Sequence, residues 1–148
     1  MTANLFNRAT PIEKIIFIVD DNEVYAKSLQ SYLQNRCPDI KEIKIFRIGE
    51  MCLMEMHRNP GIVIMDYFLN SIYEDAHSGL EIIKRIKTQK PQTNIIMLSI
   101  QKNVNIILEA IKQYDCLYVQ KDDEAFMKIE QTVNDIFNKE KTSPEPWN

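Results

Sequence analysis

Glycine is scarce in this chain, and its scarcity excludes the common nucleotide-binding loops. Only three glycines occur among 148 residues: Gly49, Gly61 and Gly79. A P-loop and a G-x-G-x-x-G turn both need closely spaced glycines, because the backbone has to approach a phosphate group at short range. Neither pattern is present in the sequence.

Paired cysteines, long apolar runs and an apolar leader are also lacking. The three cysteines, Cys37, Cys52 and Cys116, include no C-x-x-C pair, which predicts free thiols in a reducing cytosol. No apolar run approaches the roughly 20 residues that cross a bilayer, and residues 1–8 contain no signal-peptide core. The net charge of -3 indicates no basic surface for nucleic acid. We therefore expect a cytoplasmic protein that contacts neither membrane nor nucleic acid directly.

The length and composition predict one globular domain with short polar ends. Apolar residues make up 45% and charged residues 26% of the chain, an ordinary balance for a domain with a single core. Residues 1–12 are expected to be an irregular lead-in. Residues 139–148, with two prolines and many polar groups, are expected to be a tail or the start of a linker. The domain itself is predicted over residues 13–138.

Between these ends, short apolar segments alternate with amphipathic ones, which predicts repeated βα units. The expected strands are residues 14–20, 42–46, 62–66, 94–99 and 116–120. The expected helices are residues 22–35, 49–58 and 78–88, a fourth around residues 104–111, and residues 123–138. We interpret Met51, Met54 and Met56, in the second helix, as core or partial-core side chains.

The pattern within the strands predicts their order in the sheet. Segments 14–20, 62–66 and 94–99 are continuously apolar, as strands covered on both faces are, whereas 42–46 and 116–120 alternate, as edge strands can. Five successive βα units give a parallel sheet with helices on both faces. We predict an α/β fold of the flavodoxin-like type, with strand order 2-1-3-4-5 and a ligand crevice between strands one and three.

Polar and charged residues stand at the ends of four of these strands. Asp20 and Asp21 end the first, Asp66 ends the third, Ser99 ends the fourth, and Lys121 follows the fifth. The carboxyl ends of parallel strands share one edge of the sheet, where this architecture binds ligands. Each residue taken alone fits a helix cap, a turn or a surface charge. Together, at these strand ends, they indicate a functional site.

The residue types of this site predict phosphoryl transfer assisted by a metal ion. Neighbouring carboxylates repel one another, and a divalent cation relieves the repulsion. Ligands that are all oxygen, with no histidine or cysteine nearby, suit Mg²⁺ better than zinc. Asp66 would be a carboxylate nucleophile able to form an aspartyl-phosphate. Lys121 would supply a positive charge, and Ser99 a hydroxyl donor, to the phosphoryl oxygens.

The ordered motifs resemble the receiver domain of two-component response regulators over roughly residues 13–138. The matching segments are residues 18–22, 64–66, 78–82, 96–99 and 118–121. The resemblance implies that Asp66 is the phosphoacceptor, that Asp21 and Asp66 bind the metal directly, and that Asp20 acts mainly through water. It also implies the backbone carbonyl of Phe68 as a third protein ligand.

The same resemblance assigns roles in switching and in signal lifetime. Ser99 and Lys121 would hold the phosphoryl group, and Tyr118 would turn inward when Ser99 moves. Phe68 and Gln101 occupy positions that tune dephosphorylation in this family. Because a bulky Phe68 should hinder an attacking water, we hypothesise a comparatively long-lived phosphorylated state.

The resemblance further implies two kinds of partner, a phosphoryl donor and a downstream target. The donor would be a sensor histidine kinase or a phosphotransfer protein. The output face would be the fourth helix, fifth strand and fifth helix, with Asn105, Lys112, Tyr118 and Asp123, and it would act on a partner protein or an effector domain. A homodimer through this face is a further alternative. We expect a phosphoacceptor that loses its phosphate by self-catalysed hydrolysis, and not an enzyme that turns over an external substrate.

Several positions depart from the family pattern. Asn70 and Asp122 stand where prolines are usual, and Ile100 stands where a small residue is usual. Residues 70–77 form an insertion beside the site and could act as a lid. Ile100 could narrow access to the phosphoryl group. These departures keep open a degenerate receiver that binds partners without phosphorylation.

Two other readings of the acidic site are weaker. A phosphatase of the haloacid-dehalogenase kind usually carries a second aspartate two residues after the nucleophile, where Asn22 follows Asp20 in this chain. A flavin or nucleotide module of the same fold would need a phosphate loop after the first strand, and Asp20 and Asp21 would repel phosphate there in the absence of a metal.

Overall fold

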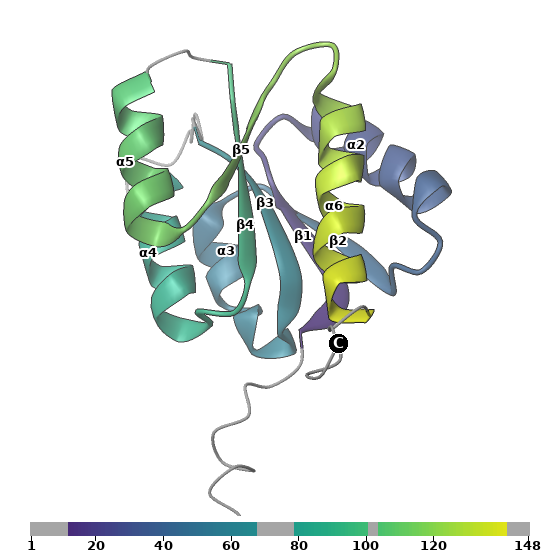
Figure 1. Ribbon diagram of the computed structural model, residues 1–148, viewed down its shortest axis with the longest axis horizontal. Helices are drawn as coiled ribbons and strands as arrows, with labels where there is room; N and C mark the ends of the chain where they lie inside the picture. Colours follow the sequence, from purple (N-terminus) through teal and green to yellow (C-terminus); the bar gives the residue numbers. More distant parts are fainter. Residues whose placement is uncertain (1–11, 68–78, 101–103, 142–148) are drawn as a thin grey trace, which may run out of the picture.

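A sheet of five parallel strands forms the centre of the fold (Figure 1). The computed structural model describes residues 12–67, 79–100 and 104–141. The strands are β1 (Glu13–Val19), β2 (Glu42–Phe46), β3 (Pro60–Asp66), β4 (Asn94–Ser99) and β5 (Leu117–Gln120). Their order is β2-β1-β3-β4-β5, and every neighbouring pair is parallel. The predicted order is confirmed, with the two alternating strands at the edges.

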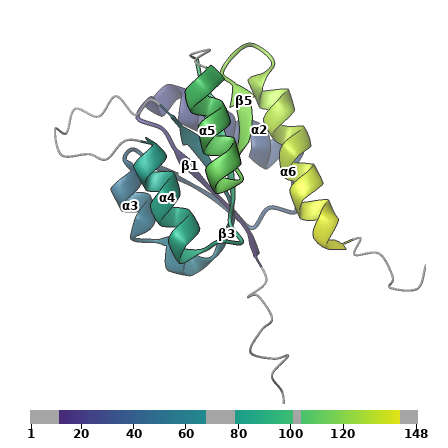
Figure 2. The ribbon, with the colours of Figure 1, turned by 60° about the vertical axis from the view of Figure 1, so that its left-hand side comes forward.

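Helices cover both faces of this sheet, as predicted. They are α2 (Glu23–Arg36), α3 (Gly49–Leu53), α4 (Gly79–Gln89), α5 (Val104–Tyr114) and α6 (Ala125–Lys141), with a 3-10 turn η1 (Met56–Arg58). Helices α2 and α6 pack on one face, and α3, α4 and α5 lie on the other (Figures 1 and 2). Within the described ranges, no helix is long and apolar enough to span a bilayer.

The central strands send alternate side chains into two separate cores. From β1, Ile16 and Ile18 enter the core beneath α2 and α6, whereas Phe17 and Val19 enter the core beneath α3 and α4. A strand segment covered on both faces is apolar at successive positions, which is why residues 15–19 of β1 form an unbroken apolar run. Burying an apolar side chain of this size stabilises the fold by about 1.5–3 kcal/mol.

The segment predicted as one helix over residues 49–58 is two shorter pieces, α3 and η1. The turn η1 ends at Asn59, whose backbone is left-handed with φ 57°, a conformation that asparagine tolerates better than most residues. Met56 is fully buried, but Met51 and Met54 are 52% and 77% exposed. Their interpretation as core or partial-core residues is therefore wrong, because Met51 on α3 and Met54 just after it face solvent.

Ion pairs line the edge strand β2. Lys44 Nζ on this strand lies 2.6 Å from Glu55 Oε2, and Arg58 Nη2 lies 2.5 Å from Glu42 Oε2. The hydrogen bond from Arg58 lowers the pKa of Glu42. That from Lys44 lowers the pKa of Glu55, so both carboxylates are charged at neutral pH. Each half-exposed pair contributes little free energy, but together they place fixed charges along this edge.

All three cysteines are free, as predicted, and the structure shows that they are also buried. Burial raises the pKa of the Cys52 thiol to about 12 and that of Cys116 to about 11, and it also raises the pKa of Cys37. The thiols therefore stay protonated at neutral pH, and a protonated, buried thiol is inert. They pack as small apolar side chains.

Gly61 lies where β3 passes close to the backbone of β1. A methyl group at this position would lie 2.6 Å from the Glu13 carbonyl oxygen and 2.7 Å from a ring carbon of Phe137. The carbonyl belongs to the neighbouring strand, so it cannot yield without distorting the sheet. We predict that Gly61→Ala lowers the free energy of unfolding by about 1–3 kcal/mol, measured by urea denaturation.

The matched control for this change is Glu13→Ala, which keeps the same carbonyl at an exposed position. It should stay within about 0.5 kcal/mol of wild type. A Gly61→Ala variant as stable as this control would contradict the close approach of the two strands.

Candidate functional site

The carboxyl edge of the sheet gathers the residues that the sequence places at strand ends. Asp20 directly follows β1, Asp66 is the last residue of β3, and Ser99 is the last residue of β4. Lys121 directly follows β5, and its backbone N–H donates a hydrogen bond of 2.9 Å to the Ser99 carbonyl. Asp66 pairs across the sheet with Leu98, so it lies next to Ser99 on the neighbouring strand.

Asp20, Asp21 and Asp66 form one acidic cluster. Each offers a carboxylate oxygen, and these oxygens lie within 4.8 Å of one another. Asp20 and Asp66 are only 1% and 8% exposed, so water screens their repulsion poorly. Mg²⁺ takes oxygen ligands at about 2.0–2.1 Å in an octahedron, which places ligand oxygens roughly 3–4 Å apart. The three carboxylates therefore fit a hard divalent cation after a small contraction.

One ammonium group lies inside this cluster. Lys121 Nζ is 3.0 Å from Asp20 Oδ2 and 3.4 Å from Asp66 Oδ2, and the lysine side chain is 9% exposed. The other carboxylate oxygen of Asp20 accepts a hydrogen bond of 2.8 Å from the N–H of Asn22. Three carboxylates and one ammonium leave the pocket with two formal negative charges, so it still attracts a divalent cation.

Tyr25, which the sequence assigns only to a helix face, also reaches the site. Asn22 caps α2 by accepting a hydrogen bond of 3.0 Å from the N–H of Tyr25. The aromatic ring then lies 4.1 Å from Lys121 Nζ, measured to the ring centre. Burial, followed by the charge of Asp20, raises the pKa of Tyr25 to about 12, so its hydroxyl stays neutral. The one signal for this contact in the sequence is the position of Tyr25, a helical turn after Asp21.

Ser99 is connected to the aromatic residue predicted as its switch partner. Ser99 is 1% exposed, and its carbonyl oxygen accepts a long hydrogen bond of 3.5 Å from the Tyr118 hydroxyl. Ile100, the next residue, is 70% exposed. The structure thus brings Ser99, Tyr118 and Lys121 to one place, while their roles in switching and the expected effect of Ile100 stay predictions.

The departures from the family pattern are only partly covered by the described residues. The Lys121–Asp122 peptide bond is trans, so aspartate replaces the usual proline without a strained bond. Phe68, Gln101 and the insertion at residues 70–77 lie outside the described residues. The expected third metal ligand, the lid and the tuning of dephosphorylation therefore stay predictions.

Comparison with known proteins identifies the family. The family model described as the response regulator receiver domain matches residues 16–134. That range contains the acidic cluster, Ser99, Tyr118 and Lys121. This chain belongs to the response regulator receiver family.

Individual relatives agree with this assignment. The transcriptional activator protein ExaE of Pseudomonas putida is 26% identical over 107 residues, which cover 72% of this chain and 47% of that protein. The chain therefore spans about half the length of this relative.

Solved receiver domains have the same fold. The beryllofluoride-activated receiver domain of DrrB from Thermotoga maritima matches 86% of this chain and 99% of its own, with 24% identity and a TM-score of 0.70. The signal receiver domain of an HD domain-containing protein from Pseudomonas fluorescens Pf-5 matches 93% of this chain and 99% of its own, with 24% identity and a TM-score of 0.69.

Removing the ammonium group from the acidic cluster should destabilise the protein. We predict that Lys121→Met lowers the free energy of unfolding by about 3 kcal/mol, because it leaves buried carboxylates without their cation. The measurement is urea denaturation in buffer free of divalent metal. Lys128→Met, at an exposed position on α6, is the control and should stay within about 0.5 kcal/mol of wild type.

A double variant separates charge repulsion from loss of packing. In the Lys121→Met background, Asp20→Asn should raise stability, since it removes one of the facing negative charges. In the wild-type background the same change should raise stability less, because there it also removes a partner of Lys121. A double variant less stable than Lys121→Met alone would refute the electrostatic explanation.

Proposed function

We propose that this receiver domain accepts a phosphoryl group on Asp66 and converts that event into a change of conformation. The observation that carries the proposal is the meeting of Asp66 with Asp20, Asp21 and Lys121 in one cluster of side chains. Membership of the receiver family supports the same chemistry. The donor would be a sensor histidine kinase or a phosphotransfer protein.

The reaction needs a nucleophile, a leaving group, and hydrogen-bond donors to the phosphoryl oxygens, on which negative charge lies after the transfer. A carboxylate oxygen of Asp66 forms a bond to phosphorus while the P–N bond of a phosphohistidine breaks, and the electron pair of that bond stays on the imidazole. Negative charge then lies on the phosphoryl oxygens. Lys121, already 3.4 Å from Asp66 Oδ2, would donate to one of these oxygens, and the Ser99 hydroxyl to another.

The acidic cluster would hold Mg²⁺ during this reaction. Asp21 and Asp66 are the proposed direct ligands, with Asp20 acting mainly through water and the Phe68 carbonyl as the expected third protein ligand. Bound Mg²⁺ would offset the charge of the carboxylates and of the incoming phosphoryl oxygens. Without a cation, the buried carboxylates would repel an anionic phosphoryl group. Phosphorylation of Asp66 would therefore require bound Mg²⁺.

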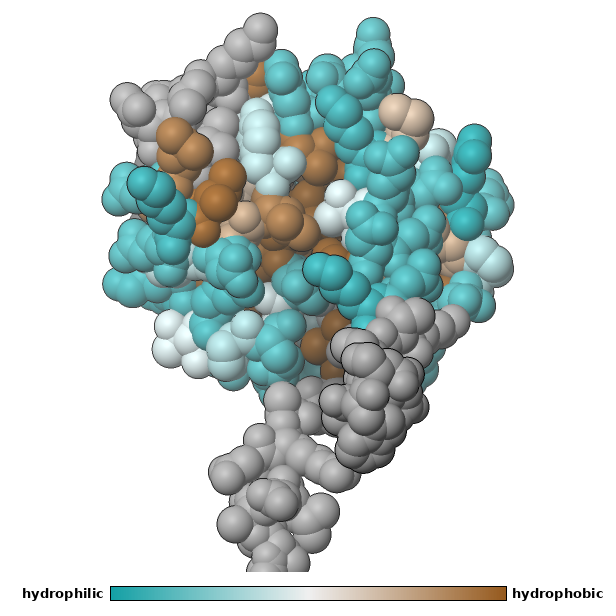
Figure 3. Space-filling model, in the orientation of Figure 1, coloured by the Kyte–Doolittle hydropathy of each residue, from teal (hydrophilic) through white to brown (hydrophobic). Residues whose placement is uncertain are grey.

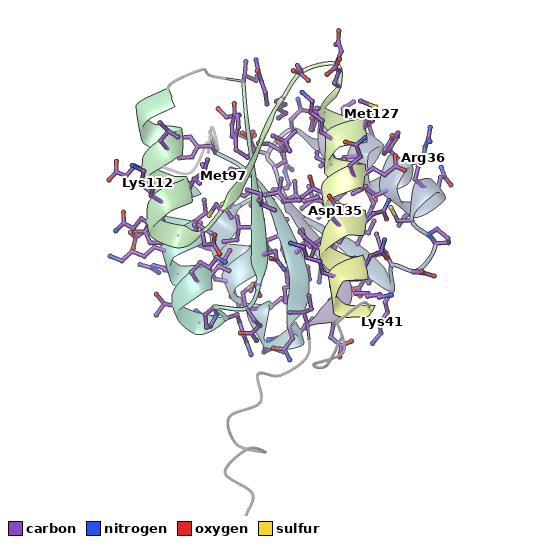
Figure 4. All side chains as sticks on the ribbon, in the orientation of Figure 1. Arg36, Lys41, Met97, Lys112, Met127 and Asp135 are labelled. Atoms are coloured by element: carbon purple, nitrogen blue, oxygen red, sulfur yellow. The ribbon has the colours of Figure 1, made fainter. Side chains whose placement is uncertain are left out.

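The proposed output face is formed by α5, β5 and α6. Figure 3 shows apolar side chains gathered between the two helices on this side of the molecule. Leu108 on α5, Leu117 on β5 and Met127 on α6 are exposed, and Lys112 points outward from α5 (Figure 4). This face would bind a partner protein or an effector domain, or a second copy of the chain.

The connection from the site to that face would run through β5. The Tyr118 hydroxyl and the Lys121 N–H both donate to the carbonyl of Ser99. If the Ser99 hydroxyl moves toward a phosphoryl oxygen, the two donors to its carbonyl, Tyr118 on β5 and Lys121 just after it, would be displaced as well. Tyr118 would then turn inward and change the surface that α5 and α6 flank.

The domain would act as a stoichiometric acceptor in the cytoplasm. The carboxylate of Asp66 would become an acyl phosphate in the reaction and would return to a carboxylate only after hydrolysis. We therefore propose a signalling switch and not a turnover enzyme, with a phosphorylated lifetime extended by Phe68. Its cytoplasmic location stays a prediction.

Binding of a phosphoryl analogue tests the proposal directly. Beryllofluoride with Mg²⁺ should bind the intact protein, followed by NMR, and binding should disappear without Mg²⁺ and in Asp66→Ala. Asp135→Ala is the matched control, because this aspartate is exposed on α6 (Figure 4). Its binding should equal that of wild type.

Two results would count against phosphoacceptance. Absence of binding in the intact protein with Mg²⁺ would favour the degenerate receiver, which binds partners without phosphorylation. Binding that persists in Asp66→Ala would show that the anion occupies another site.

Mg²⁺ alone should stabilise the folded protein. A ligand that binds only the folded state at one hundred times its dissociation constant adds about 2.7 kcal/mol, so the Tm should rise with Mg²⁺ concentration and fall back after chelation. We predict that Asp21→Asn loses most of this rise, because it removes a proposed direct ligand. The measurement is thermal denaturation followed by circular dichroism. A full Mg²⁺ effect in Asp21→Asn would exclude this carboxylate as a ligand.

A further inference from the structure

The ammonium group of Lys121 is held from two sides. Carboxylate oxygens of Asp20 and Asp66 lie 3.0 Å and 3.4 Å from Nζ. The ring of Tyr25 provides the other contact, with its centre 4.1 Å from Nζ. A cation within about 6 Å of a ring centre is attracted by the ring, and the attraction grows when both are removed from water. The lysine side chain is 9% exposed, so this attraction is in its stronger range.

The Tyr25 ring is itself held by neighbouring rings. It packs edge-on against Phe126 of α6, with ring centres 5.4 Å apart. Phe126 also contacts Tyr32, about two turns further along the same side of α2, with ring centres 5.3 Å apart. The Tyr32 hydroxyl donates a hydrogen bond of 2.7 Å to Glu130 on α6. This row of three rings lies between α2 and α6, and it leaves the Tyr25 ring little freedom to move away from Lys121.

The Tyr25 hydroxyl does not explain the position of the ring. It is buried and has no hydrogen-bond partner among the residues that the structure describes. A buried hydroxyl without a partner destabilises a fold, so the ring is held by its packing and by the cation and not by its polar group. Phenylalanine at this position would keep both contacts.

We propose that Tyr25 is a positioning residue for Lys121 in the phosphoryl-transfer site. A lysine side chain has many rotamers, and its ammonium is a mobile point charge. The Tyr25 ring confines that charge beside the acceptor oxygen of Asp66, where a phosphoryl oxygen arrives. Without the ring, Lys121 is free to swing toward solvent or to bind the aspartates in another geometry. The inference rests on the proposed role of Asp66 as phosphoacceptor.

The test compares two substitutions that differ only in the ring. In the full chain at saturating Mg²⁺, Tyr25→Leu should lower the affinity for beryllofluoride about tenfold, whereas Tyr25→Phe should stay within about twofold of wild type. Tyr114→Leu, which truncates a half-buried tyrosine packed in the other core, is the control and should bind as wild type. Mg²⁺ affinity without beryllofluoride should not fall in Tyr25→Leu, because the carboxylates are unchanged.

A second measurement reads the contact itself. In NMR spectra, the protons on Cε of Lys121 should be shifted upfield by the ring current in wild type and in Tyr25→Phe. In Tyr25→Leu the shift should be lost, with urea denaturation confirming that the variant is folded. If Tyr25→Leu does not fold, the shift in wild type and Tyr25→Phe still decides the point, and its absence there overturns the proposal.

The outcomes separate this inference from the proposed function. Wild-type affinity in Tyr25→Leu, or an equal loss in Tyr25→Phe and Tyr25→Leu, overturns the positioning role while Asp66 remains the acceptor. A parallel loss of Mg²⁺ affinity in Tyr25→Leu would indicate general damage to the pocket and also overturns it. Failure of wild type to bind beryllofluoride removes the proposed function, and the role of Tyr25 with it.

Discussion

The structure depends on keeping three carboxylates together at the edge of an apolar sheet. Asp20, Asp21 and Asp66 place oxygens within 4.8 Å of one another, a concentration of like charge that opposes folding. The rigid register of β1 and β3 holds two of them in place, and Lys121 offsets part of the repulsion from β5. Burial of apolar side chains in the two cores offsets the unfavourable repulsion within the acidic cluster. Binding of a cation or a phosphoryl group would change the net charge of this cluster.

Much of this arrangement could be predicted from the sequence, because strand patterns report burial. The unbroken apolar run of residues 15–19 and the alternation of residues 42–46 follow from the number of sheet faces that are covered, and they indicate the strand order. Once the order is known, the polar residues after each strand must meet at one edge. Asp20, Asp66 and Lys121 therefore followed from the fold, although no one of them is informative alone.

Other features could not be predicted, because they depend on where a helix ends and on how the helices pack, and hydrophobic periodicity indicates neither. Helical spacing makes residues 49–58 look like one helix, but α3 ends at Leu53, and Met51 and Met54 are exposed. The contact of Tyr25 with Lys121 joins residues from α2 and from the end of β5. It depends on how α2 and α6 pack, which periodicity alone does not define.

The charges along β2 have a consequence for how copies of this domain can associate. A sheet edge with open backbone groups is a template for strand addition, and uncontrolled addition leads to open-ended fibres. On β2, Glu42 and Lys44 are engaged with Arg58 and Glu55. A strand from another molecule would have to displace or desolvate these ion pairs in order to dock. These charged side chains therefore disfavour the addition of a foreign strand at the β2 edge.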